Sequence, residues 1–323
     1  MVEVETVRGR VSVDALGTVL MHEHVFVLSE EIWRNYPQVW DEKAGIEDAV
    51  TRLQRLKALG VDTIVDPTVI GLGRDIRRIA RVNERVDINI IPATGLYTYG
   101  DVPNFFHFRG PGTLLGGDDP MVEMFVNDIT VGIAGTPIRA AFLKCAIEEA
   151  LTPGVERVMR AVAETHRRTG APIMVHTSAP HHTGLVAKEI FASEGVDLSR
   201  LLIAHSGDTT DMDYLHQLLD GGAYVGMDRF GLDILLATDE RVSTVAKLAA
   251  EGYASQMMLS HDACCEIDWI PRDIRERVTP NWHYTFLHDS VLPALKAAGV
   301  TAGQLDTMLV ENPKAFFTPE GTN

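Results

Sequence analysis

The chain has 323 residues, of which 46% are hydrophobic and 23% are charged, which is typical of a globular protein with a sizeable buried core. Its formal net charge of −16 disfavours a surface that binds nucleic-acid phosphates or anionic lipid. The sequence contains no run of about 18 apolar residues and no apolar signal core near its start, so we expect a cytoplasmic protein without nucleic-acid or membrane partners.

Near the start, the sequence MHEHVF places His22 and His24 two positions apart after a short apolar run. In a β-strand these two side chains project to the same face, as two ligands of one metal ion must. An isolated pair of this kind is more often two surface or core histidines, because short motifs match by chance. The rest of the chain therefore decides between the two interpretations.

Further along, the chain repeats a helix, a glycine and a short apolar strand. One helical stripe over 46–59 precedes Gly60, and another over 152–169 precedes Gly170. Eight apolar strands are predicted, at 17–22, 61–66, 88–94, 140–145, 171–176, 201–205, 223–228 and 256–262. Near-continuous apolar strands indicate a parallel sheet that is buried on both faces. Eight such units without a linker predict one (β/α)8 TIM barrel domain over residues 1–323 rather than an open sheet.

Polar residues gather where these strands end. They are His22, His24, Lys144, His176, His205 and Asp262. In a TIM barrel all of these ends lie on the face where active sites are built. In an open sheet with strands in chain order, the first and eighth strands would lie roughly 34 Å apart at about 4.8 Å per strand, too far to share a metal ion. In a closed barrel they are neighbours, so the ligand set and the barrel support each other.

Each of these residues also has a structural interpretation. His176 and His205 could be core histidines bonded to carbonyl groups, and Asp262 could cap a turn. Lys144 is harder to explain in this way, because the apolar strand RAAFLKCA offers its ammonium group no obvious partner. A buried lysine tends to lose its proton, and a neutral amine can react with carbon dioxide to form a carbamate that bridges two metal ions.

Other chemistries are disfavoured. Cys145, Cys264 and Cys265 are too few for a disulfide framework, and the adjacent pair is interpreted as two small residues at a strand end. The segment GLG at 71–73 lacks the third glycine of a dinucleotide-binding loop, since Ile76 stands there. The chain has no G-x-S-x-G nucleophile elbow.

Over nearly its whole length, the sequence resembles the phosphotriesterase family of the amidohydrolase superfamily, and within it the phosphotriesterase-like lactonases. The segments that carry the resemblance, besides the strand with Lys144, are LMHEHVF (20–26), DPTVIGLGRDI (66–76), ATGLYTY (93–99), VHT (175–177), AHSGD (204–208), GMDRFGLD (226–233) and LSHDACC (259–265). The resemblance implies a quorum-quenching enzyme that opens N-acyl homoserine lactones, and it implies a homodimer.

The resemblance also implies two divalent metal ions, with zinc expected and cobalt, manganese or iron as alternatives. His22, His24 and Asp262 would hold the more buried ion, and His176 and His205 the more exposed one. Carboxylated Lys144 and a hydroxide would bridge the two ions, and the hydroxide would attack the lactone carbonyl. Tyr97 would donate a hydrogen bond to the carbonyl oxygen, while Asp262 would carry the proton to the leaving alkoxide.

Substrate selection is assigned to two segments. After the seventh strand, phosphotriesterases proper resemble one another in having a histidine where this chain has Arg229, and an arginine there is typical of the lactonases. Arg229 would contact the substrate or pair with a carboxylate such as Asp228. The long segment 264–283 supplies apolar surface for an acyl chain through Cys265 and Trp269, which predicts a preference for medium to long chains.

Two other functions stay open at this point. The same site could act mainly as an organophosphate triesterase, because a nucleophile made for a carbonyl carbon can also attack phosphorus. The chain could also be a non-catalytic metal-binding protein, although a structural site does not need a bridging lysine.

Overall fold

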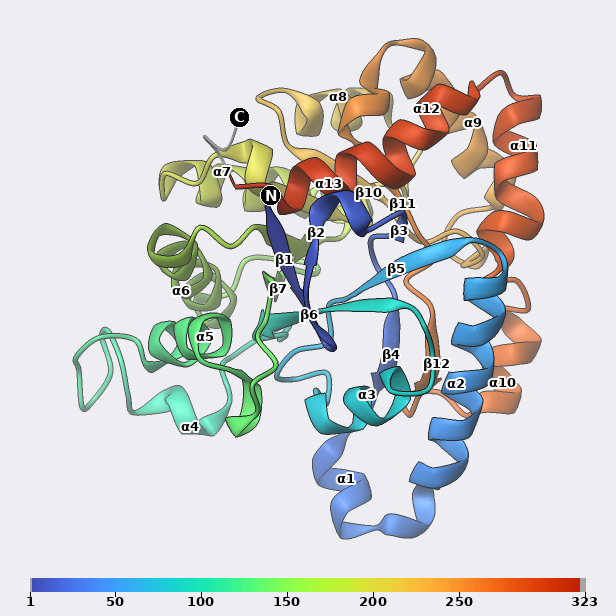
Figure 1. Ribbon diagram of the computed structural model, residues 1–323. Helices are drawn as coiled ribbons and strands as arrows, with labels where there is room; N and C mark the ends of the chain where they lie inside the picture. Colours follow the sequence, from blue (N-terminus) through green and yellow to red (C-terminus); the bar gives the residue numbers. More distant parts are fainter. Residues whose placement is uncertain (1, 320–323) are drawn as a thin grey trace.

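The computed structural model describes residues 2–319, and it is a barrel of parallel strands surrounded by helices (Figure 1). The strands run over Glu3–Thr6 (β1), Gly9–Ser12 (β2), Thr18–Leu20 (β3), His24–Val27 (β4), Val61–Asp66 (β5), Asn89–Gly95 (β6), Phe142–Ala146 (β7), Ile173–His176 (β8), Leu201–Ala204 (β9), Tyr224–Met227 (β10), Met257–Leu259 (β11) and Cys264–Ile267 (β12). Eight of them pair in the order β11-β10-β9-β8-β7-β6-β5-β3. The predicted (β/α)8 fold is confirmed.

Helices follow the strands along the chain and cover the outside of the barrel. They run over Glu30–Asn35 (α1), Glu42–Ala58 (α2), Ile76–Asn83 (α3), Asn104–His107 (α4), Pro120–Thr130 (α5), Pro153–Thr169 (α6), Thr183–Ser193 (α7), Met212–Leu219 (α8), Thr238–Ala250 (α9), Arg272–Val278 (α10), Leu292–Ala297 (α11), Ala302–Asp306 (α12) and Asn312–Phe317 (α13). None of the helices in the described part of the chain is long and apolar enough to cross a membrane.

Helix α6 shows how local sequence sets the predicted helix ends. The Thr152 side chain accepts a hydrogen bond from the backbone N–H of Val155, and Pro153 occupies the first helical turn, where its missing N–H costs nothing. Gly170 ends the helix with φ 71°, a left-handed conformation that favours glycine. The chain then enters β8, as the sequence predicts.

The two edge strands of the sheet, β3 and β11, are not paired with each other. The barrel is closed instead by the short strands that follow them. β4 follows β3 and β12 follows β11, and these two extensions pair in parallel with His24 opposite Cys264. Below this pair, the backbone N–H of Asp262 donates to the carbonyl of His22 at 3.0 Å. The ends of the first and eighth strand regions are therefore adjacent, as the proposed ligand set requires.

Side-chain alternation along each strand divides the core into two parts. On β7, Phe142 belongs to the cluster inside the barrel, whereas Leu143 and Cys145 pack outward against the helices. Lys144 shares the face of Phe142 because it lies two residues further on, so its side chain enters the barrel. His176 on β8 follows Met174 inward for the same reason.

One end of the barrel is closed by the N-terminal hairpin of β1 and β2 together with α13 (Figure 1). Val4 and Phe317 belong to the same buried cluster as Phe142 of β7, and the rings of Phe142 and Phe317 make an edge contact at 6.1 Å. The site therefore has to open at the opposite end, where the strands finish.

The first predicted strand differs from the structure. We expected an unbroken strand over 17–22, but β3 ends at Leu20, the chain bends, and His22 lies between β3 and β4. The bend lets β4 leave β3 and pair with β12. His22 and His24 still converge, with ring centroids 5.4 Å apart, through the bend rather than through strand alternation.

Candidate metal-dependent active site

Asp262 lies at the centre of the histidine cluster. Its Oδ1 is 3.3 Å from Nε2 of His22 and 3.3 Å from Nε2 of His24, and its Oδ2 is 3.8 Å from Nε2 of His205. One ligand atom from each of His22, His205 and Asp262 can be chosen so that all three lie within 4.8 Å of one another. The carboxylate thus faces histidines from both of the expected metal positions.

Two of these residues have unusual backbone conformations. His205 has φ 65° and Asp262 has φ 54°, in the left-handed region that residues other than glycine rarely adopt. At His205 the turn comes directly after β9, where a continued strand would point the side chain outward. Such strain persists only where the surrounding structure holds it, and it concentrates at functional sites.

Hydrogen bonds behind the histidines aim their Nε2 atoms at Asp262. Asp228 Oδ2 lies 2.9 Å from His22 Nδ1, and Asp228 Oδ1 lies 3.0 Å from His205 Nδ1. The Thr68 hydroxyl lies 2.7 Å from His24 Nδ1 and donates to Asp66 at 2.5 Å. Outer partners of this kind fix ring orientation in metal sites.

Burial keeps the inner histidines neutral, which is the form that binds metal. Desolvation lowers the pKa of His176 to about 4, and it lowers the pKa of His22 and holds that of His205 well below the ordinary value. Burial alone would raise the pKa of Asp262, but the facing histidines and Arg229 hold it well below its usual range. Asp262 is therefore ionised in the site.

Lys144 has no hydrogen-bond partner. Its side chain is 1% exposed, and Nζ is a buried atom without a donor or acceptor contact. Burial lowers its pKa to about 8, so a neutral amine is accessible near physiological pH. Gly95 of β6 makes this placement possible, because a Cβ there would lie 1.8 Å from the Lys144 carbonyl oxygen.

The donor set fits two divalent cations. Four imidazoles and one carboxylate supply nitrogen and oxygen ligands, and the unpartnered Lys144 amine lies among them. A carbamate on that amine would bind the metal ions and so give a role to Lys144 Nζ, which has no hydrogen-bond partner in the protein. The structure thus brings together all six residues that the sequence assigned to metal binding.

Tyr97 faces the same cavity. Its hydroxyl lies 2.7 Å from the Tyr99 hydroxyl and 3.1 Å from His176 Nδ1. Burial raises the pKa of Tyr97 well above its ordinary value, so the phenol stays protonated as a hydrogen-bond donor. His176 Nε2 contacts Glu148, which leaves Nδ1 as the ring nitrogen on the Tyr97 side.

Arg229 forms ion pairs rather than facing the cavity as a free cation. Its Nε donates to Asp262 at 2.9 Å, and its Nη1 donates to Asp208 at 2.9 Å. Asp208 also accepts from Arg241 at 2.5 Å. The expected partner Asp228 is instead bonded to the histidines. Arg229 therefore helps to hold the Asp262 carboxylate in place through Oδ2, the oxygen that also faces His205.

The cavity above the ligands has a volume of about 320 Å³. Apolar side chains from the end of β12 and from the segments after β10 and β12 form its walls and rim. They are Leu232, Ile234, Leu235, Ile267, Trp269, Ile270, Val278 and Trp282, with Val27 and Leu72 from other segments. Trp269 is 50% exposed at this rim, consistent with the role that the sequence assigned to it.

The structure corrects the placement of Cys265. We expected Cys265 to contact substrate, but its sulfur lies 3.2 Å from the Tyr284 hydroxyl in the outer core, and its neighbour Cys264 lines the cavity. Adjacent residues on a strand face opposite sides, and the register of β12 against β4 turns Cys264 inward.

Glu23, the residue between the two histidines, was not among the predicted site residues. Its carboxylate is fully buried and accepts hydrogen bonds from the backbone N–H groups of His261 and Ala263, both at 3.0 Å, and from the Ser260 hydroxyl at 2.8 Å. Glu23 thereby ties the end of the first strand region to the segment that carries Asp262. An acidic residue between two inward histidines was the available signal.

Other missed residues have weaker signals. Asp66 and Asp228 end the predicted strands in VDTIVD and GMD. Their position at strand ends was therefore a signal of the same kind as for the predicted ligands. Glu148 and Tyr99 lie in loops beyond the strands, and nothing in their spacing indicated a contact with the site.

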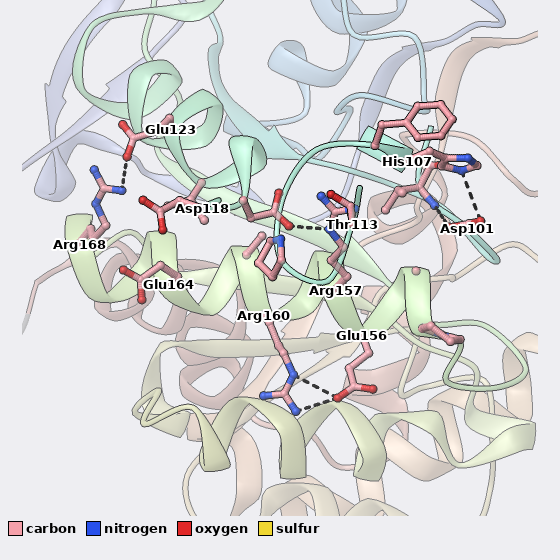
Figure 2. A pocket seen from close by; sticks show the side chains of 18 residues that line it. Asp101, His107, Thr113, Asp118, Glu123, Glu156, Arg157, Arg160, Glu164 and Arg168 are labelled. Atoms are coloured by element: carbon pink, nitrogen blue, oxygen red, sulfur yellow. Dashed lines mark hydrogen bonds and ion pairs between the residues drawn. The ribbon is translucent and has the colours of Figure 1, made fainter. Parts of the chain in front are cut away.

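A second, larger cavity lies away from the strand ends. It has a volume of about 950 Å³ and runs between the segment 101–123 and helix α6 (Figure 2). Its three arginines are in ion pairs, Arg157 with Asp119, Arg160 with Glu156 and Arg168 with Glu123. None of the candidate metal ligands lines it. We call it the α6 groove.

Comparisons with known proteins agree with this geometry. A sequence model of the phosphotriesterase family matches residues 2–317. A phosphotriesterase homology protein from Mycobacterium tuberculosis is 54% identical over 323 residues, covering 99% of each chain. An aryldialkylphosphatase from Saccharolobus solfataricus is 39% identical, over 96% of this chain and 98% of its own. A solved structure of the phosphotriesterase from Mycobacterium tuberculosis superposes with a TM-score of 0.97 at 55% identity, covering 98% of each chain.

Proposed function

The chain belongs to the phosphotriesterase family of binuclear metal-dependent hydrolases, and from that premise we propose that it opens the ester ring of N-acyl homoserine lactones, a quorum-quenching activity. The observation that supports this proposal is the cavity at the strand ends, where the candidate metal ligands form the floor and apolar side chains form the walls. A polar ester ring fits the floor, and an acyl chain fits the walls.

We assign the metal positions as the family resemblance implies. His22, His24 and Asp262 would hold one ion, His176 and His205 the other, and a carbamate on Lys144 would serve both. Zinc is the expected metal, because it accepts imidazole and carboxylate ligands in open catalytic sites, with cobalt, manganese or iron as alternatives. When bound, such ions lower the pKa of the attacking water and polarise the ester carbonyl.

The protein's own residues orient the substrate and move the proton. Tyr97 donates a hydrogen bond to the carbonyl oxygen, which gains charge as water adds to the carbonyl carbon. Asp262 takes the proton of the attacking water and passes it to the leaving alkoxide, because it is ionised and its two oxygens face His22 and His205. Arg229 keeps Asp262 oriented through their 2.9 Å contact.

The length of the acyl chain of the lactone should affect kcat/KM. The exposed apolar rim at Ile234, Leu235 and Trp269 can cover several methylene groups, each worth about 0.8 kcal/mol when buried. We expect a ten-carbon lactone to be opened at least about tenfold more efficiently than a four-carbon lactone. Equal kcat/KM values for the two would contradict this assignment of the rim.

The first test is ring opening followed by pH-stat with a ten-carbon N-acyl homoserine lactone. The protein is assayed metal-loaded, after chelation, and after reconstitution with increasing metal. We expect activity to disappear on chelation and to return near two metal ions per chain. A folded protein with two bound metals that leaves the lactone intact would contradict the proposal.

A second candidate substrate is an organophosphate triester. The 39% identical relative is named an aryldialkylphosphatase, and the same floor could bind a phosphoryl oxygen. Under the lactonase proposal, kcat/KM for the lactone exceeds that for a dialkyl aryl phosphate measured on the same metal-loaded preparation. The reverse order would make the triesterase the main activity.

We also propose that the protein is a cytoplasmic homodimer, as the family resemblance implies. Light scattering on the metal-loaded protein should give twice the mass of one chain. A mass equal to one chain at micromolar concentration would contradict the dimer.

A further inference from the structure

Arg275 is a buried arginine in the wall of the active-site cavity. It belongs to helix α10, which follows the apolar rim, and the residue is only 5% exposed. It lines the cavity together with Cys264, Val278 and Thr279. Its Nη1 lies 3.5 Å from the Cys264 sulfur, and Cys264 is the inward-facing residue of β12.

Within the described residues 2–319, no carboxylate forms an ion pair with Arg275, and the one hydrogen bond of its side chain goes to the Cys264 sulfur. At 3.5 Å from Arg275 Nη1, the Cys264 sulfur is a weak hydrogen-bond acceptor compared with a carboxylate oxygen. Two other buried arginines each have a carboxylate partner. Arg78 contacts Glu30 at 2.7 Å, and Arg241 contacts Asp208 at 2.5 Å.

Burying a cation without an anionic partner costs folding free energy. Proteins seldom retain such a group unless a bound ligand supplies the anion. A guanidinium group presents a planar set of N–H donors that matches the two oxygens of a carboxylate. The surrounding apolar walls would strengthen such a pair by excluding water. Arg229, by contrast, already binds two carboxylates and has little to offer a ligand.

We propose that Arg275 forms a carboxylate-binding subsite, and that the protein favours ester substrates whose acyl chain carries a carboxylate remote from the ring. The inference rests on the proposed function, because the ester end of the molecule would occupy the metal-ligand floor. It goes beyond that function by naming a charged group on the chain. The apolar rim would contact the methylene groups between the two ends.

The test uses two matched lactones with the same number of chain carbons, one ending in a methyl group and one in a carboxylate. We expect the metal-loaded protein to favour the carboxylate lactone in kcat/KM by about 10- to 100-fold, which is the range for a hydrogen-bonded charged group. In Arg275→Gln this ratio should fall to near one or below. In Arg275→Lys, which keeps the charge but loses the planar donor set, it should be intermediate.

Arg272→Gln on the same helix is the matched control. Arg272 is 43% exposed in its side chain and pairs with Glu276 at 2.9 Å, outside the cavity wall. Its replacement should leave the substrate ratio at the unmodified value. A ratio that falls equally in Arg272→Gln and Arg275→Gln would show that α10 was disturbed as a whole, and would overturn the assignment to Arg275.

Binding of the corresponding non-hydrolysable lactams, measured by calorimetry, separates this inference from the proposed function. Tighter binding of the carboxylate lactam that is lost in Arg275→Gln supports the subsite even if neither lactone is opened. Equal binding of the two lactams by the unmodified protein, or binding of neither, overturns it. Since the unmodified protein decides between these outcomes, the test does not depend on a variant that folds.

Discussion

The two cavities of this protein differ in how their charged side chains are satisfied. In the α6 groove, each of the three arginines has a carboxylate partner within the protein (Figure 2). In the smaller cavity at the strand ends, Lys144 has no partner and Arg275 has only a thiol. Volume alone would favour the groove, with about 950 Å³ against about 320 Å³. The unpartnered amine of Lys144 among the histidines favours the smaller cavity as the candidate active site instead, because the fold gains nothing from leaving it unpaired.

The largest expected effect is in Lys144→Met. Loss of the bridging amine should lower lactone turnover at least about 1000-fold, since metal activation of water supplies several kcal/mol. The metal-free variant should nevertheless be more stable, by on the order of 3 kcal/mol near pH 7, because the buried amine with its lowered pKa no longer opposes folding. Turnover and metal content test the expected loss of activity, and urea unfolding of the metal-free variant tests the expected gain in stability. A variant that keeps two metals and normal turnover would remove Lys144 from the site.

Asp262→Asn should reduce kcat about 100- to 1000-fold, the range for a positioned proton carrier. The amide keeps the shape of the side chain but cannot accept the proton. Metal content has to be measured on the same sample, because Asp262 is also a proposed ligand. Near-normal turnover with both metals present would exclude the proton-carrying role.

Acid should destabilise the metal-free protein through the buried histidines. Their folded-state pKa values are lowered by burial, to about 4 for His176. Between pH 6.5 and 4 the unfolded chain therefore binds more protons than the folded protein, and stability falls as the pH falls. His176 alone should cost about 2 kcal/mol between pH 7.5 and pH 5. Urea unfolding at the two pH values measures this, and a constant free energy of unfolding would contradict neutral buried histidines.

Tyr97→Phe should lower kcat about tenfold with little change in metal content. The effect is modest because Tyr99 lies 2.7 Å from the Tyr97 hydroxyl and can donate in its place. The double variant with Tyr99→Phe should therefore lose more than the product of the two single losses. Independent effects would show that Tyr99 does not substitute.

The smallest effect is expected in the α6 groove. Arg160→Gln removes the ion pairs of a half-exposed arginine with Glu156 and Glu194, which should change stability by about 1 kcal/mol or less. Lactone kcat/KM and metal content should remain at their unmodified values. A substantial loss of turnover would mean that the two cavities are coupled, and would break the distinction drawn between them.

Much of the site could be predicted from the sequence because it follows from strand alternation. On β7, the apolar run around Lys144 and the period of two place its amine inside the barrel. The same rule places His176 inward, and the barrel brings together strand ends that lie far apart in the chain. His22 lies in the expected cluster, but the predicted local geometry was wrong, since a bend replaces the last part of the expected strand.

Contacts between distant segments could not be predicted in this way. Glu148 meets His176 from a loop, and Asp228 divides its carboxylate between His22 and His205. These contacts depend on loop paths and on backbone turns that no periodic pattern encodes.

The sequence by itself determined that eight parallel strands form the barrel and that Lys144 and His176 face its interior, because these depend on short-range periodicity and residue type. Only the tertiary structure decided that Cys264 rather than Cys265 lines the cavity, that Arg229 is neutralised by two carboxylates, and that Arg275 is not. The physical reason is that ion pairing and cavity shape depend on the register of β12 against β4 and on where α10 packs, and both are set by contacts made across the whole fold.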